Sequence, residues 1–287
     1  MLLGGCKEYS KVIELPVSAV VVTEEQRALI RTLEPLAERP LERMGAYLSA
    51  ADAARLRLKE KPSDRIAQAD YNFAVSRILE IIDSEDLAPW EKPVSCPTGR
   101  GADWKLRLTP PDPRPEYHPS NFEVISADRY KFKGELVGQR TVKEGLGAPV
   151  VVIGRDLDFT AYDEFALGKQ VYYGMTVLVH FDGRDCEMVL INPLMEESVT
   201  FDGRPYPLAA DFQAPLALSL NELNPRRSEL ARMFEADEYK GQSRLQRLQI
   251  YDPRKIPVLF IHGLSNSPAT WMPMIEYLRG DDTIRKH

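Results

Sequence analysis

KIPVLFIHGLSNSPATW, residues 255–271, is the stretch that bears most directly on the fold. Its residues 257–262 are almost wholly apolar and lack the alternation of a strand with one solvated face. Such a run is typical of a strand in a parallel sheet that helices cover on both faces. Gly263 then permits a tight turn, because it has no Cβ to clash with the backbone. We therefore predict a buried strand that ends in a His-Gly turn.

A helix is expected to follow this turn. Ser267 offers a hydroxyl at the N-cap position, and Pro268 stands at the first helical position, where its missing N–H costs nothing. Three large apolar residues then recur at helical spacing and should share one face: Trp271, Met274 and Leu278. The predicted order is strand, turn and capped helix.

This order has a chemical use. Backbone N–H groups between a strand and a helix lack intrahelical partners, and acyl-transfer enzymes use two such donors to stabilise an oxyanion. With His262-Gly263-Leu264 at this point, the stretch resembles the α/β-hydrolase superfamily, whose lipases and esterases carry a His-Gly-x turn after an early core strand. The resemblance implies that the backbone N–H of Leu264 is an oxyanion donor and that His262 and Gly263 shape the turn. It also implies a serine-type hydrolase of carboxylic esters that needs no cofactor and no metal.

The remaining catalytic groups of such an enzyme are not found in the sequence. A hydrolase of this kind needs a Gly-x-Ser-x-Gly elbow that exposes the nucleophile, followed by an acid and a histidine. The 287 residues contain no Gly-x-Ser-x-Gly, and only His287 follows His262. We therefore expect the chain to be the front part of a longer hydrolase and to be inactive by itself.

The N-terminus resembles a second kind of signal. Residues 3–6, Leu-Gly-Gly-Cys, resemble the lipobox of bacterial lipoproteins, in which the cysteine is acylated. The resemblance implies a lipid on Cys6, membrane attachment through that lipid, and a place in the bacterial cell envelope. Lys7 is not the aspartate that tends to retain lipoproteins at the inner membrane, which favours the outer membrane. The alternative is an ordinary cysteine in a frayed terminus, because a complete signal needs an apolar region of about 7–15 residues.

The other two cysteines leave two interpretations open. An odd number of cysteines in an exported protein needs an explanation, and acylation of Cys6 would leave Cys96 and Cys186 as a pair. An oxidising compartment would allow them to form a disulfide. Two buried free thiols are the alternative, and we favour it because neither the spacing nor the number suggests a disulfide scaffold.

Composition excludes several classes of protein. Hydrophobic residues make up 44% and charged residues 28%, which is typical of a globular chain. No apolar run approaches the ~18 residues that a membrane-spanning helix needs. The net charge of -6 and the pI near 5.4 argue against binding to nucleic acid. Among the histidines, we expect His118 to lie in a Pro-rich loop and His180 to be a packed residue of a sheet.

The predicted fold is multidomain. Residues 1–22 are a lipoprotein-type N-terminus and linker, and residues 23–90 form a helical layer with a capping-box pattern at Thr23. Residues 91–225 form a β-rich, sandwich-like module after a Pro-rich lead-in. Two Asp-Gly pairs, at 182–183 and 202–203, predict hairpins there. Residues 226–254 should be a helical connector, and residues 255–287 begin the incomplete hydrolase domain.

This order of elements resembles a group of bacterial lipase and esterase lipoproteins, although the specific part of the resemblance covers only about residues 251–279. The partners that it implies are an ester or lipid substrate and the membrane that holds the lipid anchor. The alternative is a non-enzymatic, surface-anchored β-module that binds a partner and happens to carry a hydrolase-like segment.

Overall fold

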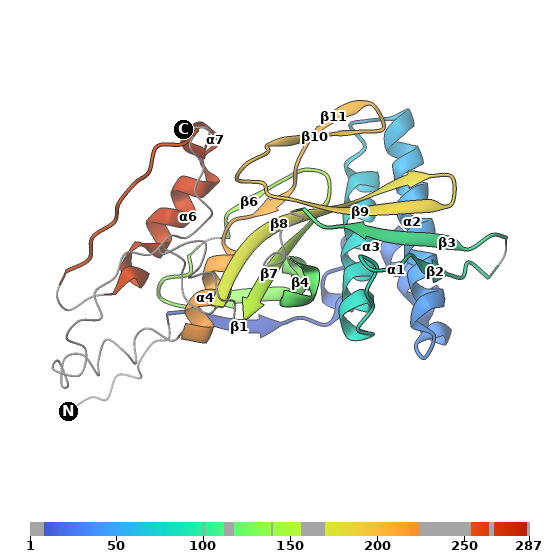
Figure 1. Cartoon of the computed structure of the whole chain (residues 1–287), viewed down its shortest axis with the longest axis horizontal. Helices are drawn as coiled ribbons and strands as arrows, with labels where there is room; N and C mark the ends of the chain where they lie inside the picture. The colour runs from blue at the N-terminus through green and yellow to red at the C-terminus, as the bar shows by residue number, and fades with distance from the viewer. Residues whose placement is uncertain are drawn as a thin grey trace.

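The computed structural model describes residues 9–99, 101–111, 118–138, 140–155, 170–223, 254–263 and 267–285 (Figure 1). The α-helices are α1 (Glu24–Leu33), α2 (Pro40–Glu60), α3 (Arg65–Ser84), α4 (Ala214–Leu223), α6 (Met272–Gly280) and α7 (Asp282–Arg285). The strands of the main sheet are β2 (Val94–Cys96), β3 (Trp104–Thr109), β4 (Phe122–Ser126), β7 (Ala148–Arg155), β8 (Gln170–Asp182) and β9 (Asp185–Ile191). The remaining strands are β1 (Lys11–Glu14), β5 (Tyr130–Lys133), β6 (Val142–Lys143), β10 (Ser198–Phe201), β11 (Arg204–Pro207) and β12 (Ala210–Asp211).

One curled, mixed sheet organises the molecule. Its six strands lie in the order β2-β3-β9-β8-β7-β4. All neighbours are antiparallel except β3 and β9, which run parallel. Three two-stranded pairs, β1-β5, β10-β11 and β12-β6, surround it. The chain is therefore a mixed α/β protein.

Helices α2 and α3 cover one face of this sheet (Figure 1). Their buried side chains, among them Leu48 and Tyr71, belong to the same hydrophobic cluster as Leu106 of β3 and Val177 of β8. The helical segment and the strands thus share one core, and burial of apolar surface from both is what holds the two layers together.

The opposite face carries α4 and the β1-β5 pair. Gly174 of β8 lies beneath Pro215 of α4, and a Cβ on the glycine would come within 3.0 Å of the proline Cγ. A smaller cluster that includes Val151, Ile153 and Ala217 fills this side. Alternate residues of β7 therefore point into two different cores, which explains why its sequence is apolar throughout.

The two Asp-Gly hairpins are confirmed. Asp182 pairs with Asp185 at the end of the β8-β9 ladder, and Gly183 takes the left-handed φ of 59°. Asp202 and Gly203 connect β10 to β11 with φ values of 48° and 75°. Two positive φ angles in a two-residue loop match the twist of the flanking strands, and Asp-Gly tolerates them.

The predicted helix starts are largely confirmed. Thr23 caps α1 by accepting a hydrogen bond from the N–H of Gln26 at 3.1 Å, and the Gln26 side chain accepts one from Val22 N–H at 2.8 Å. These reciprocal bonds satisfy donors that the first turn leaves unpaired. The α3 helix starts at Arg65, and its N-cap is Asp64, whose side chain accepts from Ala67 N–H at 2.9 Å.

The sandwich-like module is not what the structure contains. One six-stranded sheet is present, and helices α2 and α3 occupy the face on which a second sheet would pack in a sandwich. The short strands and hairpins suggested two sheets, but the parallel pairing of β3 with β9 brings Trp104–Thr109 into the main sheet. This long-range pairing leaves no local mark in the sequence.

The buried strand expected at residues 257–262 is also wrong for this structure. No strand is formed between residues 256 and 263. The predicted helix after it is present: η7 (Pro268–Trp271) leads into α6. The predicted connector at residues 226–254 lies outside the described residues except for its last residue.

Candidate functional site: the His-Gly segment

The apolar run before His262 is open to solvent. The exposed fractions are 73% for Ile256, 66% for Val258, 64% for Leu259 and 74% for Ile261. Exposed apolar groups on this scale, adjacent in sequence, are unusual on a soluble surface and mark an interaction site. The apolar composition expected of a core strand is therefore present, but within the described residues no other element covers these four side chains.

Of the His-Gly-Leu turn, the structure describes His262 and Gly263. His262 is exposed, and its Nδ1 lies 3.0 Å from the carbonyl oxygen of Gly263. A Cβ on Gly263 would meet no atom of the described residues within 4 Å. Leu264, whose backbone N–H the hydrolase resemblance makes an oxyanion donor, lies outside the described residues.

The helix after the turn starts as its sequence predicts. Ser267 is buried and its side chain accepts a hydrogen bond from Ala269 N–H at 3.3 Å, with Pro268 at the first position. The predicted apolar face, which includes Met274, is not the buried one. Met274 is exposed, and the buried residues of α6 are Ile275 and Glu276. A buried carboxylate was not predicted, because glutamate is almost never inside a protein without partners.

An aromatic pair connects the two halves of the segment. The rings of Phe260 and Trp271 lie 5.6 Å apart at an interplanar angle of 45°. Pairs of this kind contribute about 0.5–1.5 kcal/mol beyond the area they bury. Phe260 is thus the member of the apolar run that packs against the following helix, while its neighbours remain exposed.

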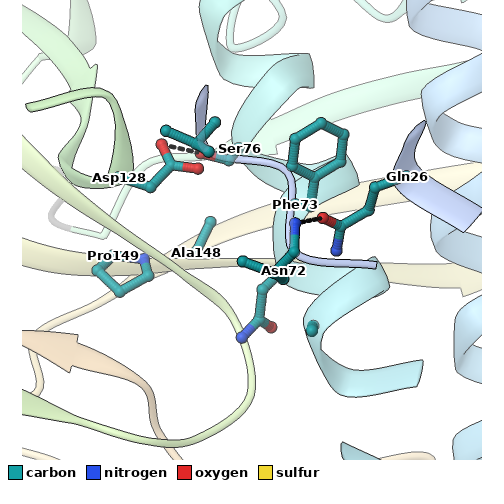
Figure 2. Close-up of a pocket in the computed structure, with 10 residues that line it drawn as sticks. Gln26, Asn72, Phe73, Ser76, Asp128, Ala148 and Pro149 are labelled. Atoms are coloured by element: carbon teal, nitrogen blue, oxygen red, sulfur yellow. Dashed lines mark hydrogen bonds between the residues drawn. The ribbon is translucent and has the colours of Figure 1, made fainter. Parts of the chain in front are cut away.

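A small cavity lies elsewhere, between α3 and the sheet (Figure 2). Its volume is about 180 Å³, and its lining includes Gln26, Asn72, Ser76 and Asp128. The side chain of Asn72 donates to Gly145 O at 2.9 Å and accepts from Gly147 N–H at 2.7 Å. The Ser76 hydroxyl likewise donates to Asp128 Oδ1 at 3.1 Å, so these polar side chains of the lining make structural bonds.

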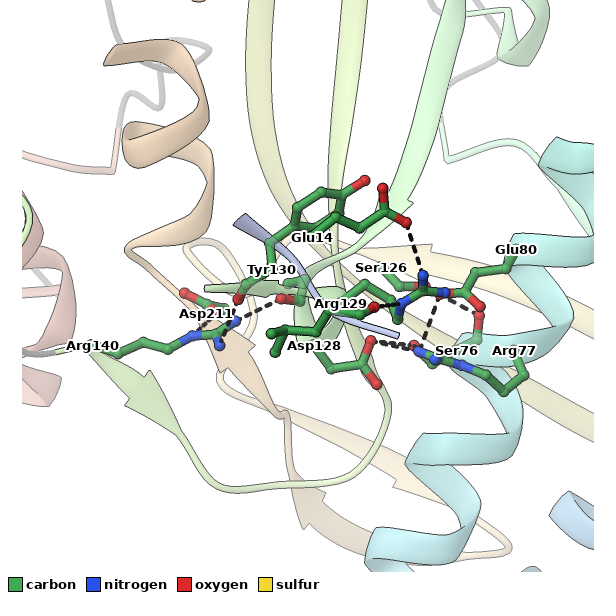
Figure 3. Close-up of polar contacts among 12 residues, drawn as sticks. Glu14, Ser76, Arg77, Glu80, Ser126, Asp128, Arg129, Tyr130, Arg140 and Asp211 are labelled. Atoms are coloured by element: carbon green, nitrogen blue, oxygen red, sulfur yellow. Dashed lines mark hydrogen bonds and ion pairs between the residues drawn. The ribbon is translucent and has the colours of Figure 1, made fainter. Parts of the chain in front are cut away.

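Charged residues beside this cavity tie the N-terminal strand to α3 (Figure 3). Arg77 is buried and its Nη2 lies 2.6 Å from Asp128 Oδ1. Arg129 reaches Glu80 at 3.0 Å and Glu14 of β1 at 2.8 Å. The Arg77 charge is buried, so removing Asp128 would leave it without its shortest ion pair and should destabilise the fold. We assign this network to stability, because Arg77 is only 2% exposed and its charge is compensated by these carboxylates.

The two described cysteines are free thiols. Cys96 and Cys186 are both buried and unbridged. They lie on β2 and β9, and β3 runs between these strands. Two strand spacings amount to about 9.6 Å, beyond the ~7 Å across which a disulfide can form. Burial raises the pKa of each thiol to about 12. Cys6 lies outside the described residues.

The contacts of His118 and His180 are structural. His118 is exposed at the start of η4 (Pro119–Asn121), with its Nδ1 2.7 Å from Ser120 Oγ. His180 lies in β8 against the ring of Phe201 at 5.4 Å, and burial lowers its pKa. Across the described ranges, no cluster of three or more His, Cys, Asp or Glu side chains could hold a metal ion. The helices that the structure describes are too short or too polar to cross a membrane.

Comparison with known proteins finds no relative of this chain. No family model, no curated protein and no solved structure matches the chain. The arguments about function therefore rest on the residues and their geometry.

Proposed function

We propose that residues 255–285 form the opening strand, turn and helix of a serine-type α/β-hydrolase that acts on carboxylic esters. The helices and the sheet before them are the accessory N-terminal region of that enzyme. One observation carries the proposal: an apolar run with the composition of a doubly covered strand lies exposed directly before His262 and Gly263. Pairing with further strands would satisfy its backbone and cover its side chains.

The chemistry follows from the turn. In acyl transfer, the attack of a serine on the ester carbonyl turns the carbonyl oxygen into an oxyanion, which needs preorganised N–H donors. The backbone N–H of Leu264 is one such donor in this proposal, and His262 and Gly263 shape the turn. Among the described residues, none would lie within 4 Å of a Cβ on Gly263, which supports this role because a substrate must approach the backbone closely. The nucleophile and the other triad members lie outside these residues.

The proposal includes an anchor at the cell envelope. Acylation of Cys6 would place the enzyme at a membrane, with the outer membrane favoured, next to ester or lipid substrates. Mass spectrometry of the native protein, expressed from its own start, should find the lipid on the peptide that begins with Cys6. An unmodified thiol on that peptide would refute the anchor and leave the hydrolase proposal standing.

The oxyanion donor can be tested by removing one backbone N–H. We expect the reading frame downstream of His287 to encode a Gly-x-Ser-x-Gly elbow, and the protein made from that frame to hydrolyse esters. There, Leu264→Pro removes the N–H, while the matched control Leu264→Ala keeps it. Leu264→Pro should lower kcat by about 10²–10³-fold and Leu264→Ala should leave most of the activity.

Two results would overturn the proposal. Equal activity in the two variants would show that the Leu264 N–H is no oxyanion donor. A stop codon directly after His287 would leave the segment without strands to join. It would favour the alternative of a surface-anchored module that binds a partner without catalysis.

A further inference from the structure

The six-stranded sheet, the short strand pairs and helices α1 to α4 are called the main unit here. The helix pair α6–α7 lies against this unit on the side away from α2 and α3 (Figure 1). It meets three short segments that are far apart in the sequence. Thr141 precedes β6, Phe212 and Gln213 connect β12 to α4, and Glu197 precedes β10. We call Thr141, Glu197, Phe212 and Gln213 the helix seat.

The centre of this contact is a buried carboxylate. Glu276 of α6 is 6% exposed. Its Oε1 accepts a hydrogen bond from the Thr141 hydroxyl at 2.6 Å and one from Gln213 Nε2 at 3.1 Å. A carboxylate is costly to bury unless such donors replace water. The seat therefore supplies bonds that match this side chain of α6.

A buried arginine makes the second contact. Arg285 of α7 is 6% exposed, and its guanidinium lies over the ring of Phe212 at 4.9 Å. Its Nη2 is 3.3 Å from Glu197 Oε1. Lys255, just before the apolar run, donates to Arg285 O at 2.8 Å and also to Leu194 O. The seat thus contacts the end of the helix pair, and Leu194, three residues before Glu197, bonds the lysine that precedes the apolar run.

Close approach at the end of α6 depends on one glycine. A Cβ on Gly280 would lie 2.3 Å from Thr141 Cγ2, well inside the distance that real contacts allow. Any larger residue would push α6 away from Thr141 and stretch the hydrogen bond between Thr141 and Glu276. The contact therefore combines charge, hydrogen bonding and shape.

Asp211 directly precedes Phe212 and Gln213 and fixes the position of the loop that carries these two residues of the seat. Its Oδ1 accepts from Ala214 N–H at 2.9 Å, and its Oδ2 is 2.7 Å from Arg140 Nε. Figure 3 shows Arg140 beside Asp211, and Arg140 Nη2 in turn donates to Ala127 O at 2.7 Å. Because Asp211 is held on both sides, the loop that carries Phe212 and Gln213 has a fixed position relative to α4.

We propose that the helix seat is the docking surface on which the main unit holds α6–α7 and so positions the His-Gly turn. The main unit is then a structural part of the hydrolase rather than a separate binding module. Its occupant is the helix pair of this same chain, fixed by Glu276 and Arg285. The role in a hydrolase rests on the proposed function, whereas the contacts of the helix seat do not depend on it.

Hydrogen–deuterium exchange in the full chain tests the seat. Glu276→Lys puts a cation where the seat offers donors, and Gly280→Val forces α6 away from Thr141. Each should speed exchange in residues 267–285 by at least about tenfold, with residues 177–191 unchanged. Glu276→Gln keeps an acceptor oxygen and should retain most of the protection. Glu25→Lys, on the exposed side of α1, is the control for added charge.

Thr141→Val keeps the test decisive if Glu276→Lys fails to fold. It removes one hydrogen bond to the carboxylate from outside the helix pair and should speed the same exchange about tenfold. Unchanged exchange in Gly280→Val and Thr141→Val would overturn the proposal, as would wild-type exchange at the rate of an unstructured peptide. These readouts need no ester hydrolysis, so a failure of the seat and a failure of the hydrolase proposal remain distinct.

Discussion

The hydroxyl of Tyr71 bonds both backbone groups of Val179. It donates to the carbonyl oxygen and accepts from the N–H, each at 2.8 Å. On the side of β8 that faces β7, the ladder stops at Val177, which pairs with Ala148. A side chain of α3 therefore takes the place of a missing strand residue and joins the helical layer to the sheet.

Replacing this hydroxyl should destabilise the whole unit. In Tyr71→Phe, the Val179 N–H and C=O stay buried but lose their partner, which costs about 1–3 kcal/mol of unfolding free energy. Urea unfolding followed by circular dichroism measures the change. Tyr277→Phe, at an exposed position, is the matched control and should unfold like the wild type. A Tyr71→Phe protein as stable as the wild type would show that these bonds contribute nothing net.

The thiols of Cys96 and Cys186 should be inert in the folded protein. Only the thiolate reacts, and burial raises both pKa values to about 12, so neither ionises near neutral pH. Iodoacetamide at pH 8 should label these two residues only after denaturation, as peptide mapping by mass spectrometry would show. A peptide in which the two are bridged would contradict the separation of β2 and β9 by β3.

Stability should depend on pH through His180. Burial lowers its pKa in the folded state below the usual value near 6.5. Below about pH 6.5 the unfolded chain therefore binds a proton that the folded chain does not, and the unfolding free energy falls as the pH is lowered. His180→Gln should reduce this dependence. Equal pH dependence of the wild type and this variant in urea unfolding between pH 5 and 7.5 would contradict the assignment.

The exposed apolar run should make the isolated chain self-associate. Unpaired apolar strands are templates for pairing with another copy. Val258→Lys with Ile261→Lys should shift the protein toward monomer in analytical ultracentrifugation, and should change stability by no more than about 0.5 kcal/mol because both side chains are exposed. Leu56→Lys with Ile66→Lys is the control, since these exposed residues lie on helices of the main unit. A monomeric wild type would contradict the prediction.

Local signals in the sequence predicted local structure well. The hairpins at Gly183 and Gly203, the cap at Thr23 and the helix start at Ser267 each depend on a few adjacent residues. Their turn and cap chemistry is set within four residues, so no knowledge of the rest of the chain is needed.

Contacts across the chain were not predictable in the same way. Nothing near Tyr71 indicates that its hydroxyl meets Val179, 108 residues away, and nothing near Glu276 indicates Thr141, 135 residues away. The apolar pattern at residues 257–262 shows that the segment suits a sheet interior, but a pattern contains no information on which strands cover it. The candidate site was therefore found from its sequence, and its exposure only from the structure.

The central claim is that the His-Gly segment belongs to a serine hydrolase. The most direct measurement is p-nitrophenyl ester turnover by the 287-residue chain and by the protein that continues through the downstream reading frame. The account predicts no turnover by the chain alone, and turnover by the longer protein that is lost when the serine of its Gly-x-Ser-x-Gly elbow is changed to alanine. Serine-dependent turnover by the 287 residues alone would contradict it, because the catalytic groups would then lie within this chain.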